Sequence, residues 1–552
     1  MIRTPVLIVG GGPVGLTLGI DLAHRGQSAL LVEERHTASE HPKATLLGSR
    51  SMELFRRWGL DEPIFAAAVP NDHPYYIIFT TRLAGQELHR FRSPSINEGR
   101  YRDPEALKRF RELEWSPYSK TQIGQQALEP VLRQHAETLA PLEMRHGWRF
   151  ETLEQHADHV RARIVEVATG RIEEVHADYL VACDGGASGI RRALGIRRNG
   201  RGRMRSNVSF FFRSREFLQV HGLGVANLYF VFSPGSFGVF TAIDGVELWN
   251  YQYYFLDPSR TTEAPDAADI LHRAVGKPFQ FELLQTTHWH HHQSVARTWR
   301  AGRVLLAGDA AHLFAPTGGV GMNTGIGDAC DLAWKLEAIF RGWGDESLLD
   351  SYEIERKPVA VRNSLISATN SDKIDMVMDE TPEGISEDTA EAQRARVVLS
   401  RKIKWLARQF NSAGTHLGHR YVDSPIIVPD GTPEPPDDPS QLVPSSWPGM
   451  RAPHAWMSDG RSTLDLFGRD FVLVRCAVGA SGAGNAEEQR LLDAAAAVGM
   501  PLQLIDIDDA AIAALYARRL VLVRPDGHVA WRGDRLPDDV AALVDRVRGK
   551  AH

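Results

Sequence analysis

Three glycines near the start of the chain have the spacing of a phosphate-binding turn. Gly10, Gly12 and Gly15 follow a short apolar run at residues 6–9, and Pro13 stands where a helix would begin. In such a turn the first glycine permits a tight bend, the second lets backbone approach a pyrophosphate, and the third lets helix and strand pack closely. The N-terminus of the helix would then face the phosphates. The spacing therefore predicts a dinucleotide site.

An acidic residue completes this pattern. A second apolar run at residues 29–32 ends in Glu33, which would accept a hydrogen bond from a ribose hydroxyl. Glu34 is the alternative for this role, and we prefer Glu33 because it follows the apolar run directly. The pattern by itself does not distinguish NAD from FAD, because both cofactors use it.

Two further apolar runs end in turns that are rich in glycine, aspartate and alanine. One turn lies in VACDGGASGIR at residues 181–191, and the other is GDAAH at residues 308–312, followed by PTGGVGMN at residues 316–323. They resemble the D-G-x-x-S-x-x-R, G-D-A-A-H and P-x-x-G-x-G-x-N segments of flavoprotein monooxygenases. Together with the glycine turn, they make the chain similar to the class A flavin-dependent aromatic hydroxylases, which include phenol, chlorophenol and aromatic-polyketide hydroxylases.

The resemblance extends over nearly the whole chain. Shorter matches are HPKA at 41–44, RSME at 50–53, QQALE at 125–129 and YEIER at 352–356, and the segments at 448–454 and 524–532 resemble the thioredoxin-like C-terminal domain of the larger members. Two departures are visible. Lys43 stands where the family has an arginine, which keeps the charge and loses the bidentate fork. The C-terminal segment has no C-x-x-C, so thioredoxin likeness there implies structure and not redox chemistry.

The resemblance implies FAD as the resident cofactor and assigns residues to it. Asp309 would meet the ribityl and ribose hydroxyls, backbone N–H groups at Gly319 and Gly321 would reach the pyrimidine edge, and Pro316 would line the pocket over the isoalloxazine. The full set of expected cofactor residues is Gly10, Gly12, Pro13, Gly15, Glu33, Glu34, Lys43, Arg50, Gln125, Asp184, Gly308, Asp309, Gly319, Gly321, Met322 and Asn323.

The same resemblance implies the chemistry. There is no second G-x-G-x-x-G, so NADPH or NADH would bind transiently as a consumed substrate, near Asp184, Arg191 and Lys43. Reduced flavin and O2 would give a C4a-hydroperoxide that hydroxylates a phenolic or polycyclic aromatic ring. A Baeyer–Villiger oxygenase or an epoxidase on the same scaffold is the alternative, and a non-catalytic flavoprotein is the remote one. No residue is assigned as the general base.

The region from about residue 200 to 290 carries the candidate substrate residues. Its aromatic and β-branched runs, separated by Ser-Pro-Gly and Asp-Gly turns, predict an inserted antiparallel sheet. Tyr229, Trp249, Tyr251 and Tyr253 are interpreted either as pocket lining or as sheet core. Histidines at alternate positions from 288 to 292 would share a strand face, but no acidic partner has suitable spacing, so no metal site is predicted.

These elements predict an α/β fold built from three units. A Rossmann-like FAD-binding domain, an inserted antiparallel-sheet substrate domain and a C-terminal thioredoxin-like α/β domain are expected. Eight prolines between residues 424 and 448 indicate an extended segment ahead of the last domain. The expected ranges are 1–70, 101–190 and 290–400 for the FAD-binding domain, 71–100 and 191–289 for the substrate domain, 401–448 for a linker or wrapping segment, and 449–552 for the last domain.

Composition limits the class of protein. The 552 residues are 43% hydrophobic and 24% charged, and 63 basic against 69 acidic residues give a net charge of −6, which argues against nucleic acid or an anionic membrane as a partner. The most apolar stretch contains Pro13 and Asp21 and is too polar to span a bilayer. Three scattered cysteines do not make a disulfide framework. We expect a cytoplasmic enzyme that acts on a small aromatic molecule and O2, with a homodimer suggested by analogy alone.

Overall fold

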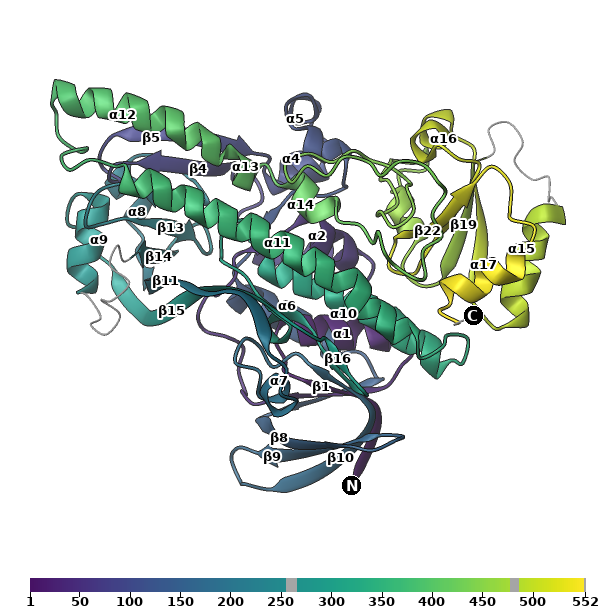
Figure 1. Cartoon of the computed structure of the whole chain (residues 1–552). Helices are drawn as coiled ribbons and strands as arrows, with labels where there is room; N and C mark the ends of the chain where they lie inside the picture. The colour runs from purple at the N-terminus through teal and green to yellow at the C-terminus, as the bar shows by residue number, and fades with distance from the viewer. Residues whose placement is uncertain (255–265, 477–485, 551–552) are drawn as a thin grey trace.

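The computed structural model describes residues 1–254, 266–476 and 486–550. Figure 1 shows two large sheets and a separate C-terminal unit, joined by one long helix, α11 (Leu348–Asp379), which crosses between them. The N-terminal end of α11 packs in the core of the C-terminal unit through Leu348. Its other end packs against the second sheet through Ile374 and Met378. This helix therefore connects all three units.

The first sheet is the predicted Rossmann-like unit. Its strand order is β16-β17-β10-β1-β2-β7, and β1 is parallel to both β2 and β10. The second half of β1, residues 6–9, is buried, as expected for a parallel strand that helices cover on both faces. Its elements are β1 (Ile2–Val9), α1 (Pro13–His24), β2 (Ala29–Glu33), α6 (Gln125–Glu137), β7 (Leu142–His146), β8 (Trp148–Gln155), β9 (Val160–Glu166), β10 (Ile172–Ala182), α7 (Gly189–Ala193), β16 (Arg300–Ala301), β17 (Val304–Leu306) and α10 (Gly321–Phe340).

The second sheet is largely antiparallel and has the order β18-β15-β11-β14-β13-β12-β4-β5. One face packs against α9 (Ala267–Val275) in a dense aromatic core. Its strands are β4 (Tyr75–Thr80), β5 (Glu87–Ser93), β11 (Arg198–Arg213), β12 (Leu228–Val231), β13 (Gly238–Ala242), β14 (Leu248–Tyr254), β15 (Glu282–Ala296) and β18 (His312–Leu313). This sheet extends past the expected end at residue 289, because β15 continues to Ala296 and pairs there with β18.

The segment at 401–448, expected as a linker, is helical in its first part. After α12 (Ala390–Ile403) come the short helices α13 (Ala407–Phe410) and α14 (Ala413–Leu417), and α14 packs on α2 (Ser49–Arg56). The remainder, which holds the eight prolines, consists of turns, bends and irregular backbone with no helix or strand. The helical part is polar in sequence and is held by tertiary packing, which composition does not reveal.

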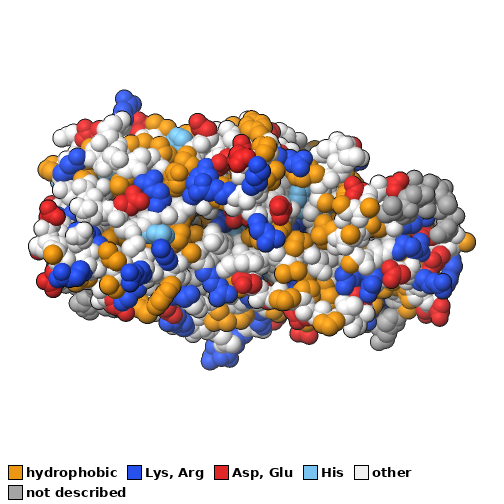
Figure 2. Space-filling view, turned by 90° about the horizontal axis from the view of Figure 1, so that it is seen from above, with side chains coloured by type: hydrophobic (Ala, Val, Ile, Leu, Met, Phe, Trp, Pro, Cys, Tyr) orange, Lys and Arg blue, Asp and Glu red, His pale blue; other side chains and the backbone are white. Residues whose placement is uncertain are grey.

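The C-terminal unit is a four-stranded sheet in the order β20-β19-β21-β22. It contains β19 (Phe471–Cys476), α15 (Ala486–Ala497), β20 (Leu502–Ile507), α16 (Ala510–Tyr516), β21 (Leu520–Val523), β22 (Val529–Gly533) and α17 (Val540–Val547). Among the described helices, none combines the length and apolar character needed to cross a membrane. Viewed from above, the molecule shows acidic and basic side chains intermingled over that face (Figure 2).

Candidate functional site

One large cavity lies where the two sheets meet. Its volume is about 1340 Å³. Typical small-molecule pockets measure about 300–1,000 Å³, so this cavity can hold a dinucleotide together with a second molecule. Three strands of the first sheet, β1, β2 and β10, end at its wall, which is where ligands bind in open α/β sheets. We refer to the part lined by the first sheet as the cofactor half and to the part lined by the second sheet as the substrate half.

The glycine turn has the geometry that its spacing predicts. Gly10 has φ +108°, and a side chain there would collide with the carbonyl oxygen of Cys183. A side chain at Gly15 would collide with the carbonyl oxygen of Gly10, so this glycine serves helix–strand packing. A Cβ at Gly12 would meet nothing within 4 Å. Gly12 and Pro13 line the cavity at the start of α1, where no side chain caps the helix. The free N–H groups suit a phosphate.

Glu33 lies at the end of β2 and lines the cavity. Its carboxylate accepts hydrogen bonds from the backbone N–H of Gly11 at 2.6 Å and from that of Arg35 at 3.0 Å. Burial raises the pKa of Glu33, but these hydrogen bonds outweigh burial and leave that pKa below its ordinary value. The group is therefore an ionised acceptor. Glu34 also lines the cavity, but its exposed side chain pairs with Arg149 at 3.5 Å.

The GDAAH turn places one carboxylate in the cavity, and a second carboxylate, from α10, is bonded to the turn from beneath. Asp309 lines the cavity with a side chain that is exposed to the cavity space, and desolvation by the protein around it raises its pKa although His312 opposes the shift. Gly308 does not line the cavity. It has φ +59°, and its N–H donates to Asp328 on α10 at 3.2 Å. Asp328 also accepts from the His312 ring at 2.7 Å and from Arg356 at 2.9 Å. No sequence motif indicated this role for Asp328.

We expect Asp328→Asn to destabilise the turn. Burial raises the pKa of Asp328, but His312 and Arg356 lower it below 3.8. A depressed folded-state pKa gives stability that is complete above the unfolded pKa and lost as the pH falls through the folded-state value. The variant should lose about 3 kcal/mol from pH 8 to pH 5, and less in stronger acid. Thermal unfolding at several pH values measures this loss. Asp350→Asn, at an exposed pair with Arg300, is the control and should change little.

The loop at residues 316–323 leads into α10. Pro316, Gly319, Gly321 and Met322 line the cavity. Gly319 has φ +62°, a conformation that favours glycine. The helix begins at Gly321 without a side-chain cap, so its first N–H groups are free at the edge of the cavity. The positive end of the helix would stabilise negative charge on a bound ring.

Two residues of the expected cofactor set, Asn323 and Arg50, do not line the main cavity, and their side chains have protein partners. The amide oxygen of Asn323 accepts from the Gly48 N–H at 2.8 Å and from the Ser51 hydroxyl at 2.6 Å, and its NH2 group donates to Leu46 and Gly319 carbonyls. It thus ties two loops of the site together. Asn323 and Arg50 both line a separate small cavity, which lies toward the C-terminal unit.

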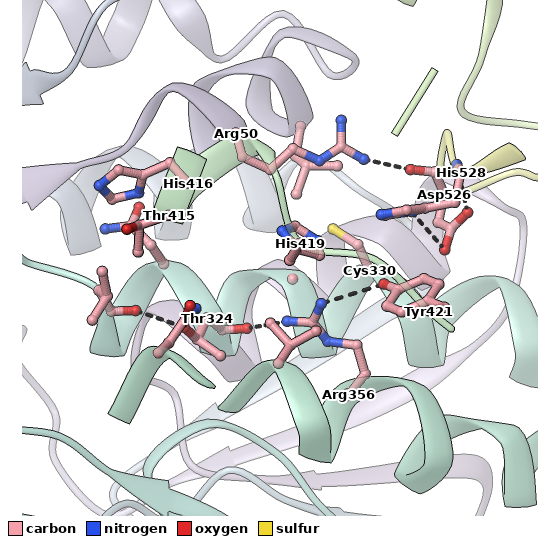
Figure 3. A pocket seen from close by; sticks show the side chains of 16 residues that line it. Arg50, Thr324, Cys330, Arg356, Thr415, His416, His419, Tyr421, Asp526 and His528 are labelled. Atoms are coloured by element: carbon pink, nitrogen blue, oxygen red, sulfur yellow. Dashed lines mark hydrogen bonds and ion pairs between the residues drawn. The ribbon is translucent and has the colours of Figure 1, made fainter. Parts of the chain in front are cut away.

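Arg50 is the second of these residues. Its guanidinium donates to Glu53 at 3.0 Å and to the carbonyl oxygen of Asp526 at 2.6 Å. Figure 3 shows this side chain pointing toward Asp526 and His528 of the C-terminal unit. The family-like motif at Arg50 therefore joins α2 to the C-terminal unit in this structure.

Three further expected residues line the cofactor half. The Asp184 carboxylate accepts from the Ile190 N–H at 3.2 Å through one oxygen, and its other oxygen is buried without a partner among the described residues. Gln125 donates to Glu129 at 2.6 Å from the start of α6, and Lys43 is exposed at the wall. These features fit FAD. The uncapped starts of α1 and α10 and the open space at Gly12 suit its phosphates and polar ring edge, and the unpaired oxygen of Asp184 suits its hydroxyls.

The substrate half is formed by one face of the second sheet, and not by the aromatic residues expected there. Tyr229, Trp249 and Tyr251 are fully buried on the opposite face, around α9, and the Tyr253 side chain packs at the edge of the same core. Of the two interpretations of these residues, pocket lining and sheet core, the structure therefore supports sheet core, because side chains alternate between the faces of a strand and these four lie on the face away from the cavity. The residues that do line it from β12, β13 and β14 are Leu228, Phe230, Val239, Thr241, Asn250, Gln252 and Tyr254.

The family described as FAD binding domain matches residues 3–364, and the family described as aromatic-ring hydroxylase, C-terminal, matches residues 445–551. A putative polyketide hydroxylase of Streptomyces halstedii is 35% identical over 96% of this chain and 93% of its own length. Tetracenomycin B2 monooxygenase-dioxygenase of Streptomyces olivaceus is 32% identical, over 99% and 98%.

Solved structures give the same result. The rebeccamycin biosynthetic enzyme RebC with reduced flavin is 39% identical and has a TM-score of 0.88, covering 100% of this chain and 99% of its own. The flavin-dependent monooxygenase PieE, in complex with FAD and substrate, is 30% identical with a TM-score of 0.89, and the coverage is 100% of both chains.

Proposed function

Because the chain belongs to the family of FAD-dependent aromatic-ring hydroxylases, we propose that it inserts one oxygen atom of O2 into a phenolic or polycyclic aromatic substrate, with NADPH or NADH as the electron donor. The observation that carries the proposal is a single cavity that joins a dinucleotide cradle to a chamber with apolar and amide walls. The relatives named as putative polyketide hydroxylases, together with the matching aromatic-ring hydroxylase family, support an aromatic substrate of this kind.

The residues of this chain would bind the cofactor, orient the substrate ring and exclude water from it. The start of α1 would hold the pyrophosphate, Glu33 the ribose, and Asp309 the flavin hydroxyls. Bound FAD, once reduced, supplies the activation of O2. The free N–H groups at Gly321 would stabilise negative charge on the ring edge. Phe230 and Tyr254 would hold the substrate ring in place and exclude water.

The nicotinamide donor would dock at the cofactor half. Asp184 and Lys43 line that part of the cavity, as does Arg192. Arg191, which the sequence analysis favoured, donates instead to the Ile196 carbonyl at 2.6 Å. We therefore assign the cationic contact to Arg192 and Lys43. The division into cofactor, substrate and C-terminal domains, and a homodimer, remain part of this proposal.

Aerobic turnover tests the proposal. FAD-loaded protein would be mixed with NADPH or NADH and a panel of phenols and polycyclic aromatics. We expect a substrate to stimulate oxidation of the donor and to give nearly one hydroxylated product per donor consumed. Absence of stimulation by any compound, despite bound FAD, would contradict it. A lactone or epoxide in the product would favour the Baeyer–Villiger or epoxidase alternative.

A further inference from the structure

Three buried polar side chains form one wall of the substrate half. Lys120 directly precedes β6 (Thr121–Gln122), Gln409 lies on α13, and Ser412 follows that helix. All three line the main cavity, and they are only 8%, 5% and 4% exposed. We call these three residues the donor wall. Two of them come from the segment that sequence alone indicated as a linker.

Several hydrogen-bond donors of the donor wall have no partner among the described residues. The Lys120 ammonium donates to the carbonyl oxygen of Phe410 and has two more hydrogens. Neither the Gln409 side-chain NH2 nor the Ser412 hydroxyl has a partner among the described residues. Buried donors without partners cost about 1–3 kcal/mol each, so such a cluster is typical of a ligand contact.

The charge of this wall is also unbalanced. In the described part of the chain, no carboxylate lies within 4.0 Å of the Lys120 ammonium. Burial lowers the pKa of Lys120, and the more distant Glu112 partly opposes this shift. The second sheet contributes neutral side chains to the wall of the same cavity, such as Asn250 and Gln252. A buried cation facing a cavity is stabilised by an anion inside it.

We infer that the donor wall binds an anionic oxygen of the substrate, either a carboxylate or the phenolate of an acidic phenol. This inference rests on the proposed function, because it names the substrate class of the same cavity. Lys120 would supply the charge, and Gln409 and Ser412 would supply two further hydrogen bonds. The fused rings would then lie along the face of the second sheet that carries Phe230 and Tyr254.

Ligand binding without turnover tests this inference. FAD-loaded protein is titrated, without NADPH or NADH, while the flavin absorbance is followed. The probes are anthraquinone-2-carboxylate with its methyl ester, and alizarin with its dimethyl ether. We expect at least one acid to bind at least tenfold more tightly than its neutral partner. Lys120→Met should weaken that acid about 30-fold and leave the neutral partner nearly unchanged, whereas Lys120→Arg should restore much of the loss.

Further variants keep the test decisive if Lys120→Met does not fold. Ser412→Ala and Gln409→Met should each weaken the acid about three- to tenfold. Lys108→Met, at an exposed lysine on α5 (Pro104–Arg109), is the matched control and should change nothing. If anthraquinone-2-carboxylate loses affinity in these variants, the bound anion is a carboxylate. If alizarin loses affinity, the bound anion is a phenolate.

Two outcomes would overturn the inference. One is that neither acid binds, or that each binds no more tightly than its neutral partner. The other is that Lys120→Met binds the acid as well as the wild type does. Because the titration needs no turnover, either outcome leaves the proposed reaction untouched. Conversely, selective binding of an acid without any oxidation of NADPH or NADH would count against the reaction and not against the donor wall.

Discussion

Replacing Gly12 with alanine should leave the protein folded and weaken FAD binding about a hundredfold, which corresponds to about 2.7 kcal/mol. A Cβ at this position meets no atom of the described residues within 4 Å, and the backbone conformation there suits any residue, so folding is spared. The methyl group would instead occupy the space at the start of α1, where backbone must approach the pyrophosphate.

A second glycine variant supplies the contrast. In Gly15→Ala the new methyl group would collide with the carbonyl oxygen of Gly10, so we expect this variant to unfold at a clearly lower temperature even without FAD. The measurements are the thermal midpoint of each apoprotein and the Kd for FAD from quenching of flavin fluorescence. Wild-type affinity in Gly12→Ala would contradict the assignment of the cradle.

Replacing Arg524 with methionine should loosen the C-terminal unit. This guanidinium is fully buried and donates to Glu355 at 2.5 and 3.0 Å, to Asp331 at 3.1 Å and to Asp526 at 2.7 Å. Burial raises the pKa of Glu355, but Arg524 and Lys335 together hold it below its ordinary value. The variant would leave three buried carboxylates with one lysine, at a cost of about 3–5 kcal/mol.

The cluster joins β21 and its following turn to α10 and α11, so its loss should act at the contact between units. Nearby, the Arg356 guanidinium donates a hydrogen bond to the Tyr421 hydroxyl, as Figure 3 shows, and this pair extends the contact between the units. We expect a lower thermal midpoint and faster proteolytic release of the C-terminal segment. Arg461→Met, at an exposed pair with Asp459, is the control. Unchanged proteolysis of the Arg524 variant would show that the cluster does not hold the units together.

The sequence alone was sufficient to assign residues where a phosphate-binding turn requires a particular backbone conformation. Gly10 and Gly15 could be assigned in advance, because any side chain would collide with a carbonyl oxygen at either place. The chamber could not be assigned in the same way. Alternation predicts that Tyr251 and Tyr253 share a face, but which face meets the cavity depends on where α9 packs. Asp328 likewise became visible only once the fold had brought it under the GDAAH turn.

The donor wall could not be predicted from the sequence for the same reason, because its residues are brought together only by the fold. Lys120 and Ser412 lie far apart in the chain and meet only because α13 returns to the cavity after α11. A proline-rich composition indicates an extended segment but says nothing about the helices that precede it. Motifs thus located the cofactor half of the site, whereas tertiary packing determines the substrate half.

The source of the inserted oxygen tests the central claim most directly. Turnover under 18O2 in ordinary water, with NADPH or NADH and a polycyclic phenol that stimulates oxidation, should give a product that carries one 18O atom. A matched reaction in H2 18O under ordinary O2 should give an unlabelled new hydroxyl group. A product whose new oxygen comes from water, or one that gains no oxygen at all, would contradict the account of this chain as a flavin-dependent aromatic monooxygenase.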